Sequence, residues 1–138
     1  MTESGPRRKL AAILAADVVN FSRMMGENED RTLRNLKICR TITDRAIQSN
    51  HGRVFGGAGD SIIAEFGSPV DALLAATGFQ QDLESRNQTV PLEDQMVFRV
   101  GLNLGDVIIE GDNLYGDQWI GKVSGAIKSK SEAQAIVT

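Results

Sequence analysis

The sequence predicts an α+β domain in which two helices cover one face of an antiparallel sheet. Apolar or alternating runs of strand length are separated by two longer segments with helical spacing. A glycine-rich turn marks a hairpin between two of the strands. The resulting order is β-α-β-β-α-β followed by a further strand, which is the ferredoxin-like, split-βαβ arrangement.

The first strand is expected over residues 10–19, an apolar run rich in Ala, Ile, Leu and Val that ends near Asp17. A basic patch at residues 7–9 precedes this run and imitates an export signal. The uninterrupted apolar run has only seven residues, which is the lower limit for the core of such a signal. We therefore expect a buried strand that follows a loose polar arm of residues 1–8.

The first helix is expected to begin at Asn28, a good capping residue that is followed by two acids. It is expected to end at His51-Gly52, because glycine commonly follows a helix C-terminus. We interpret His51 as a solvated loop residue and Cys39 as a reduced helix residue. The positions with helical spacing that should face the core are Leu33, Leu36, Ile38, Ile42, Ala46 and Ile47.

The hairpin is expected to pair residues 53–55 with residues 61–66 around a turn at residues 56–60. A second helix should follow, with Ser68 as its cap, Pro69 at its first position and Asp71 in its first turn. Its core face should consist of Ala72, Ala75, Ala76, Phe79 and Leu83.

The remaining segments complete the sheet. Residues 85–95 are expected to form a polar loop, and residues 96–102 a third strand region. Gly105-Asp106 should interrupt this strand before residues 107–109, and Gly111-Asp112-Asn113 is a further turn signal.

Composition limits the classes of function. The chain of 138 residues suits one domain, and its 41% hydrophobic and 24% charged residues are ordinary globular values. A net charge of -3 argues against a nucleic-acid partner. One Cys and one His exclude an internal disulfide and a Cys/His zinc cluster, and they favour a cytoplasmic setting. No apolar run approaches the ~20 residues of a membrane span.

Two acidic residues stand where strand geometry would expose them at one edge of the sheet. Asp17 ends the first strand, and Asp60 lies at the tip of the hairpin that should neighbour that strand. Mg²⁺ takes one or two carboxylates and completes its octahedron with water and phosphate oxygens. Strand-end aspartates are also common as caps and turn formers, so this pattern alone leaves both interpretations open.

The connection after the first strand is suited to holding phosphates. Backbone N–H groups of loops that lead into helices often bind anions. The glycines at positions 56, 57 and 59 would let the hairpin turn approach a nucleotide closely. The residues of the connection are Val18, Val19, Asn20, Phe21 and Ser22.

Four segments, in order and at matching spacing, resemble the motifs of class III nucleotidyl cyclases, the adenylate and guanylate cyclases, and bacterial members most of all. They are residues 16–22 (ADVVNFS), 57–66 (GAGDSIIAEF), 98–107 (FRVGLNLGDV) and 114–117 (LYGD). We therefore interpret residues 9–117 as the first two-thirds of a cyclase homology domain, and residues 118–138 as a divergent tail.

The resemblance implies conversion of ATP or GTP into a 3′,5′-cyclic monophosphate and pyrophosphate for intracellular signalling, with ATP as the expected substrate. Asp17 and Asp60 match the two metal-binding aspartates, which hold two Mg²⁺ or Mn²⁺ ions, and Val18 matches a main-chain ligand. The main chain of residues 18–22 matches the phosphate-holding loop. The family works as head-to-tail dimers, so a homodimer or a heterodimer with another cyclase domain is expected.

The sequence departs from the family pattern at four positions. Gly56 stands where many members carry a base-selecting Lys, and Asn113 stands where that residue has its Asp partner. Ile120 and Ser124 stand where the family has an Asn that orients the ribose and an Arg that stabilises the transition state. Because groups that meet developing charge are worth 10²–10³ in rate, we expect little or no activity from the chain alone.

The tail suggests a changed reading frame. Residues 118–130 do not match the family, and Gly121-Lys122-Val123 can be encoded so that a one-base change of frame reads Ala-Arg-Leu, which is similar to the family stretch near this point. We therefore expect a truncated or frameshifted domain after Asp117. The gene sequence beyond that codon tests this expectation.

Two alternatives remain. The chain could be a non-catalytic or vestigial cyclase-like regulatory domain that binds metal-nucleotide or a cyclase partner. It could also be another ferredoxin-like nucleotide enzyme, such as a polymerase palm or a diguanylate cyclase. Against the latter, Gly59-Asp60 is followed by Ser61 and not by the residues of the diguanylate cyclase hairpin motif.

Overall fold

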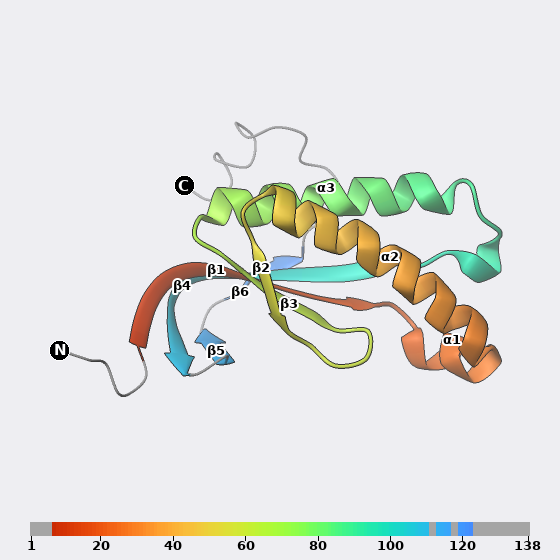
Figure 1. Ribbon diagram of the computed structural model, residues 1–138, viewed down its shortest axis with the longest axis horizontal. Helices are drawn as coiled ribbons and strands as arrows, with labels where there is room; N and C mark the ends of the chain where they lie inside the picture. The colour runs from red at the N-terminus through yellow and green to blue at the C-terminus, as the bar shows by residue number, and fades with distance from the viewer. Residues whose placement is uncertain (1–6, 111–112, 117–118, 123–138) are drawn as a thin grey trace.

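The computed structural model describes residues 7–110, 113–116 and 119–122, and it describes side chains within residues 12–54 and 56–102. Figure 1 shows the elements in chain order. They are β1 (Arg7–Val18), α1 (Phe21–Glu27), α2 (Glu29–Ser49), β2 (Arg53–Gly56), β3 (Ile62–Phe66), α3 (Pro69–Asn87), the 3₁₀ helix η1 (Leu92–Asp94), β4 (Phe98–Glu110), β5 (Asn113–Gly116) and β6 (Trp119–Lys122).

The strands that the structure describes form one antiparallel sheet in the order β2-β3-β1-β4-β5, with β6 also paired to β4. Helices α2 and α3 lie on the same side of this sheet (Figure 1). Strand β3 lies between β1 and β2, and β1 lies between β3 and β4, which is the interleaving of a split βαβ fold. The predicted α+β, ferredoxin-like class is therefore confirmed.

The centre of the sheet is a long ladder between β1 and β4. It runs without a shift in register from Arg7 opposite Ile109 to Val18 opposite Phe98. The expected break at Gly105-Asp106 was wrong, because Gly105 pairs with Ala11 and the ladder carries β4 across this dipeptide. Residues 7 and 8, which we placed in the polar arm, are part of β1 for the same reason, while residues 1–6 lie outside the described residues.

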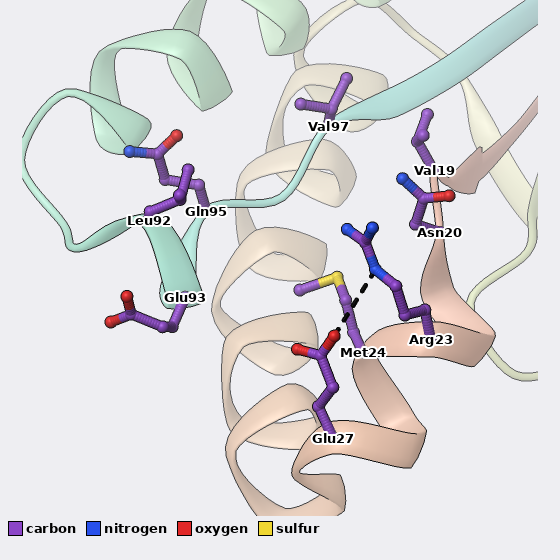
Figure 2. Close-up of a pocket in the computed structure, with 9 residues that line it drawn as sticks. All are labelled: Val19, Asn20, Arg23, Met24, Glu27, Leu92, Glu93, Gln95 and Val97. Carbon is purple, nitrogen blue, oxygen red and sulfur yellow. Dashed lines mark ion pairs between the residues drawn. The ribbon is translucent and has the colours of Figure 1, made fainter.

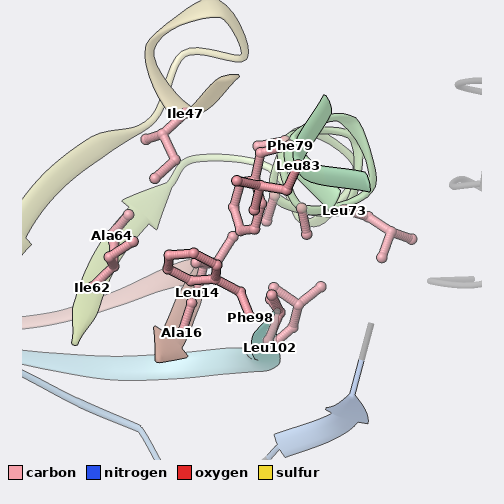
Figure 3. Packing of buried hydrophobic residues seen from close by; sticks show 14 of the residues in the cluster. Leu14, Ala16, Ile47, Ile62, Ala64, Leu73, Phe79, Leu83, Phe98 and Leu102 are labelled. Atoms are coloured by element: carbon pink, nitrogen blue, oxygen red, sulfur yellow. The ribbon is translucent and has the colours of Figure 1, made fainter. Parts of the chain in front are cut away.

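The core lies between the sheet and the two long helices. Figure 3 shows side chains of β1, β3 and β4 meeting those of α2 and α3. Leu14, Phe66 and Phe79 are among the largest side chains that are almost completely buried. The predicted face of α3 is confirmed, since all five of its members are at most 2% exposed: Ala72, Ala75, Ala76, Phe79 and Leu83.

The predicted face of α2 was partly wrong. Leu33 and Ile38 are 44% and 50% exposed, whereas Leu36 and Ile47 are buried as expected. Cys39 is completely buried. The buried stripe also includes Thr32, Asn35 and Thr43, polar residues that an apolar pattern overlooks.

The ends of the helices follow the expected capping chemistry. Asn28 accepts a hydrogen bond of 3.0 Å from the N–H of Arg31, and Ser68 accepts one from Asp71. At the C-terminus of α2, His51 takes the left-handed conformation with φ of 65°. Gly52 follows, and its N–H donates to the carbonyl of Ile47 at 2.8 Å. A glycine is needed there because an added Cβ would lie 2.3 Å from Cε2 of Phe66.

Two short helices were missed. Residues 21–27 form α1, which has no fully buried residue and therefore gave no apolar pattern. Part of the expected polar loop at residues 85–95 is regular, because α3 continues to Asn87 and η1 occupies Leu92–Asp94. Among the residues that the structure describes, no helix is long and apolar enough to cross a bilayer.

Candidate metal and nucleotide site

The fold brings Asp60 to the end of β1, beside the residue that follows Asp17. The backbone N–H of Val18, the residue after Asp17, donates a hydrogen bond of 2.8 Å to Oδ2 of Asp60. Val18 is the last residue of β1, and its backbone N–H ties the tip of the hairpin to the end of that strand. The chain thus holds the second carboxylate beside the residue that follows the first.

The hairpin turn holds Asp60 in place through its glycines. Gly57 has φ of 118°, and a Cβ added there would lie 2.2 Å from the carbonyl oxygen of Ser61. Gly59 has φ of 62°, in the left-handed region that favours glycine. The N–H of Ser61 donates to the carbonyl of Ala58 at 3.0 Å and closes the turn around Asp60.

Arg99 is a third charged member of this end of the sheet. It lies directly opposite Asp17 in the β1–β4 ladder, and its Nε donates to Oδ1 of Asp17 at 2.8 Å. The pKa of Arg99 is raised above its ordinary value, first by that hydrogen bond, then by the charge of Asp17, with a smaller contribution from the charge of Asp60. A single guanidinium therefore acts on both carboxylates.

The segment after β1 turns sharply into α1. The N–H of Val19 donates to the carbonyl of Val97 at 2.8 Å, and Asn20 takes the left-handed conformation with φ of 61°. Asn tolerates this region better than most residues. Because the N–H groups of Val18 and Val19 already have acceptors, the amides suited to phosphate are those at the start of α1, where helical N–H groups have no intrahelical acceptor.

Side chains of α3 fix the strand segment that receives Val19. The side chain of Asn87 pairs with Met96 in both directions, with distances of 2.8 Å to its carbonyl and 3.1 Å from its N–H. Nε2 of Gln80 donates to the carbonyl of Phe98 at 2.9 Å. The carbonyl of Val97, between these two anchored residues, is therefore held in position for Val19.

A polar network attaches η1 to α2 and α3. Asp94 accepts from Nε of Arg31 at 2.6 Å and from Nδ2 of Asn35 at 2.8 Å. The hydrogen bonds from Arg31 and Asn35 lower the pKa of Asp94 to about 2. Arg86 donates to the carbonyl of Asp94 at 3.0 Å and to Oδ1 of Asn35 at 2.6 Å, so this corner is cross-linked to both long helices.

A pocket of about 330 Å³ lies beside the connection after β1 (Figure 2). Val19 and Asn20 form one wall, and Arg23 and Glu27 of α1, which pair at 3.6 Å, form another. Neither Asp17 nor Asp60 lines it. The lining of the pocket therefore begins two residues after Asp17 but includes neither carboxylate.

The two carboxylates suit Mg²⁺ or Mn²⁺. Asp17 uses Oδ1 for Arg99 and Asp60 uses Oδ2 for Val18, so each keeps its other oxygen outside these bonds. The side chain of Asp17 is 40% exposed and can be reached from solvent. Within the described part of the chain there is no group of three or more His, Cys, Asp or Glu that could hold a metal. A cation here would complete its shell with main-chain, water or phosphate oxygens, as Mg²⁺ commonly does.

Comparison with known proteins places this arrangement in a family. The chain is 40% identical over 119 residues to a protein of Rhizobium meliloti (strain 1021) provisionally named adenylate cyclase 3. It is 34% identical, with a TM-score of 0.74, to an adenylate/guanylate cyclase/hydrolase from Silicibacter pomeroyi, covering 81% of this chain and 66% of that one. The chain belongs to the class III nucleotidyl cyclase family.

More distant cyclases share the fold. The adenylyl cyclase CyaB from P. aeruginosa superposes with a TM-score of 0.65 at 18% identity, over 86% of this chain and 68% of that one. No protein-family profile matches the chain. The match to the Rhizobium meliloti protein covers 85% of this chain but 20% of that protein, so the chain spans about one fifth of the length of this relative.

The positions at which this cyclase sequence departs from its family can be placed only in part. Gly56 is the last residue of β2, and a Cβ added there would contact only Cβ of Ile63, at 3.9 Å. Asn113 is the first residue of β5, and Ile120 lies in β6. Ser124 and the rest of the tail from residue 123 lie outside the described residues, as do residues 117 and 118.

Two contributors to the candidate site were not predicted from the sequence. Arg99 was read as part of a motif and not as a partner of Asp17. This pairing follows from the β1–β4 register, which places Asp17 opposite Arg99. The carbonyl of Val97 as the acceptor for Val19 had no sequence signal, because any residue can supply a backbone carbonyl.

Proposed function

We propose that this chain supplies the metal-binding half of a nucleotidyl cyclase site that makes a 3′,5′-cyclic nucleotide and pyrophosphate, with ATP as substrate and cAMP as product. The observation that supports the proposal is the hydrogen bond between Val18 and Asp60, which holds the second carboxylate beside the residue that follows Asp17. The name of the Rhizobium meliloti relative favours an adenylate cyclase.

In this proposal each residue of the site has a limited task. Asp17 and Asp60 hold two divalent cations, with the main-chain carbonyl of Val18 as a further ligand. The N–H groups of Asn20, Phe21 and Ser22 receive phosphate oxygens. The bound ions would supply charge neutralisation on the phosphates and activation of the ribose hydroxyl.

The complete site is proposed to need a second cyclase domain. Ile120 offers an apolar side chain where the family uses Asn, so the groups that stabilise the transition state must come from a partner. In a head-to-tail heterodimer, this chain would give the metals to a site to which the partner gives Asn and Arg. A homodimer would hold metals and nucleotide with little or no turnover.

A mixing experiment tests this proposal. The chain is combined with a cyclase domain that keeps its Asn and Arg but whose own two metal-binding aspartates have been replaced. Formation of cAMP is measured with ATP and Mg²⁺ or Mn²⁺. We expect product only from the mixture, and none when this chain carries Asp17→Asn. Light scattering of the mixture verifies the heterodimer, and circular dichroism verifies folding. A folded heterodimer that makes no cAMP above background would contradict the proposal.

A non-catalytic regulatory role is the second candidate, favoured because Ile120 of β6 stands where the family carries the Asn that orients the ribose. It predicts that the chain binds Mn²⁺ and ATP but makes no product in any mixture. Titration calorimetry with Mn²⁺ and a non-hydrolysable ATP analogue separates the two candidates from a chain that binds neither.

A further inference from the structure

Asp17 already has a cationic partner in the absence of any metal. Nε of Arg99 donates to its Oδ1 at 2.8 Å, from the residue directly opposite in the β1–β4 ladder. The same ladder fixes both backbones, so the contact does not depend on a flexible loop. The side chains of Arg99 and Asp17 are 54% and 40% exposed, so the pair lies at an open edge of the sheet.

The second carboxylate is held at the same end of the sheet. Asp60 is itself held by the N–H of Val18 and cannot turn away from this end of the sheet without losing that bond. Two carboxylates and one guanidinium therefore lie at this end of the sheet, and the guanidinium pairs directly with Asp17.

We propose that Arg99 is a built-in competitor of the divalent cation: it neutralises Asp17 when no metal is bound, and it must leave Asp17 when a metal binds. This inference rests on the proposed function, because it concerns the same two carboxylates. It adds that the metal affinity of the site is set by Arg99 as well as by the ligands.

The physical reason is repulsion between two cations that need the same anion. A divalent ion at Asp17 would lie within a few ångströms of the guanidinium, where like charges repel appreciably even near a surface. The ion pair that must be given up is partly exposed, and such pairs are weak enough to be displaced. Together the two effects predict a change in metal affinity of about tenfold when Arg99 is neutralised.

Titration of the full chain with Mn²⁺, without nucleotide, measures this directly. The electron paramagnetic resonance signal of free Mn²⁺ reports binding in wild type, Arg99→Gln and Arg99→Lys. Arg53→Gln is the matched control, because Arg53 also forms a cross-strand pair, with Glu65 at 2.6 Å, and its loss changes the net charge equally. Circular dichroism checks that every variant is folded.

We expect Arg99→Gln to bind Mn²⁺ about tenfold more tightly than wild type, and Arg99→Lys and Arg53→Gln to bind within about twofold of wild type. Equal affinity in Arg99→Gln and wild type would overturn the inference, and so would an equal gain in Arg53→Gln, which would reveal a general charge effect. If no folded variant binds Mn²⁺ saturably, or if binding is unchanged by Asp17→Asn, the metal site of the proposed function fails as well.

A second readout follows the guanidinium itself. The Nε–H resonance of Arg99 is observed by nuclear magnetic resonance during a titration with diamagnetic Mg²⁺. Release from Asp17 predicts a shift of this resonance that saturates with the metal and is absent in Asp17→Asn. A resonance that stays in place while Mg²⁺ saturates the site would also overturn the inference.

Discussion

The backbone N–H of Val18 donates a hydrogen bond of 2.8 Å to the carboxylate of Asp60, which lies 42 residues further along the chain. This bond joins the end of the central strand to the tip of the β2–β3 hairpin. Two roles of Asp60 can be tested separately, because the hydrogen bond needs only an acceptor oxygen whereas metal binding needs the negative charge.

Replacing Asp60 by Asn or by Ala therefore has different consequences. Asp60→Asn keeps an acceptor for the N–H of Val18 and should lower the free energy of unfolding by less than about 1 kcal/mol. Asp60→Ala leaves the N–H without its acceptor and should cost about 1–3 kcal/mol. Urea denaturation measures both values. Equal losses in the two variants would show that the bond to Val18 contributes nothing to stability.

Asn87 should stabilise the fold and also hold the carbonyl of Val97 in position for Val19. Asn87→Ala removes both bonds to the backbone of Met96, and we expect a loss of about 1–3 kcal/mol. Amide hydrogen exchange at Val19 should also accelerate, since its acceptor Val97 is next to Met96. Thr89→Ala is the control, because it removes only an exposed bond to the carbonyl of Arg86. Unchanged exchange at Val19 in Asn87→Ala would show that Asn87 does not hold the carbonyl of Val97 in position.

Gly52 and Gly78 differ in whether the surrounding structure leaves room for a side chain. An added Cβ at Gly52 would lie 2.3 Å from a ring carbon of Phe66, so Gly52→Ala should cost about 1–3 kcal/mol in free energy of unfolding. Gly78 lies inside α3 with nothing within 4 Å of an added Cβ. Gly78→Ala should therefore stabilise the chain by about 1 kcal/mol. Thermal and urea denaturation test the opposite signs, and a destabilised Gly78→Ala would contradict the packing of α3.

Stability should depend on pH through Asp94. The pKa of this carboxyl is lowered in the folded chain from 3.8 to about 2, chiefly by hydrogen bonds from Arg31 and Asn35. A lowered folded pKa gives stability that is complete above the unfolded value and is lost as pH falls toward the folded one. The stability advantage of wild type over Asp94→Asn should therefore be constant above about pH 5 and shrink between about pH 4 and pH 2.

The matched control for this pH dependence is Glu93→Gln. Glu93 lies 3.6 Å from the same Arg31, but its side chain is 65% exposed. Its effect on the free energy of unfolding should be small at every pH, because exposed pairs contribute little. If the difference between wild type and Asp94→Asn does not change from pH 5 to pH 2, Asp94 does not carry the pH dependence.

The sequence predicted those parts of the fold whose signals are local. Asn28 and Ser68 cap α2 and α3 as expected, and the spacing of Ala72 to Leu83 identified the buried face of α3. It failed on α2, because Thr32 and Asn35 share the buried stripe through hydrogen bonds and not through apolar character. It failed at Gly105 as well, because cross-strand pairing overrides a local turn signal.

In the candidate site, too, the local features could be predicted from the sequence and the contacts between distant segments could not. The type of residue and its place at a strand end or hairpin tip predicted Asp17 and Asp60 as candidates, and the fold brings Asp60 to the residue that follows Asp17. The contacts of Arg99 and Val97 depend on the register between β1 and β4 and on the backbone of the segment after α3. Neither feature is encoded in a short motif, so the cation partner of Asp17 became visible only in three dimensions.

The central claim, that Asp17 and Asp60 hold divalent cations together, is tested most directly by Mn²⁺ titration of wild type, Asp17→Asn, Asp60→Asn and the double variant, all verified to be folded. Shared ligation predicts that each single substitution removes most of the binding and that the double variant is hardly worse than either, because the two residues act as one unit. Wild-type affinity in either single variant would contradict the account.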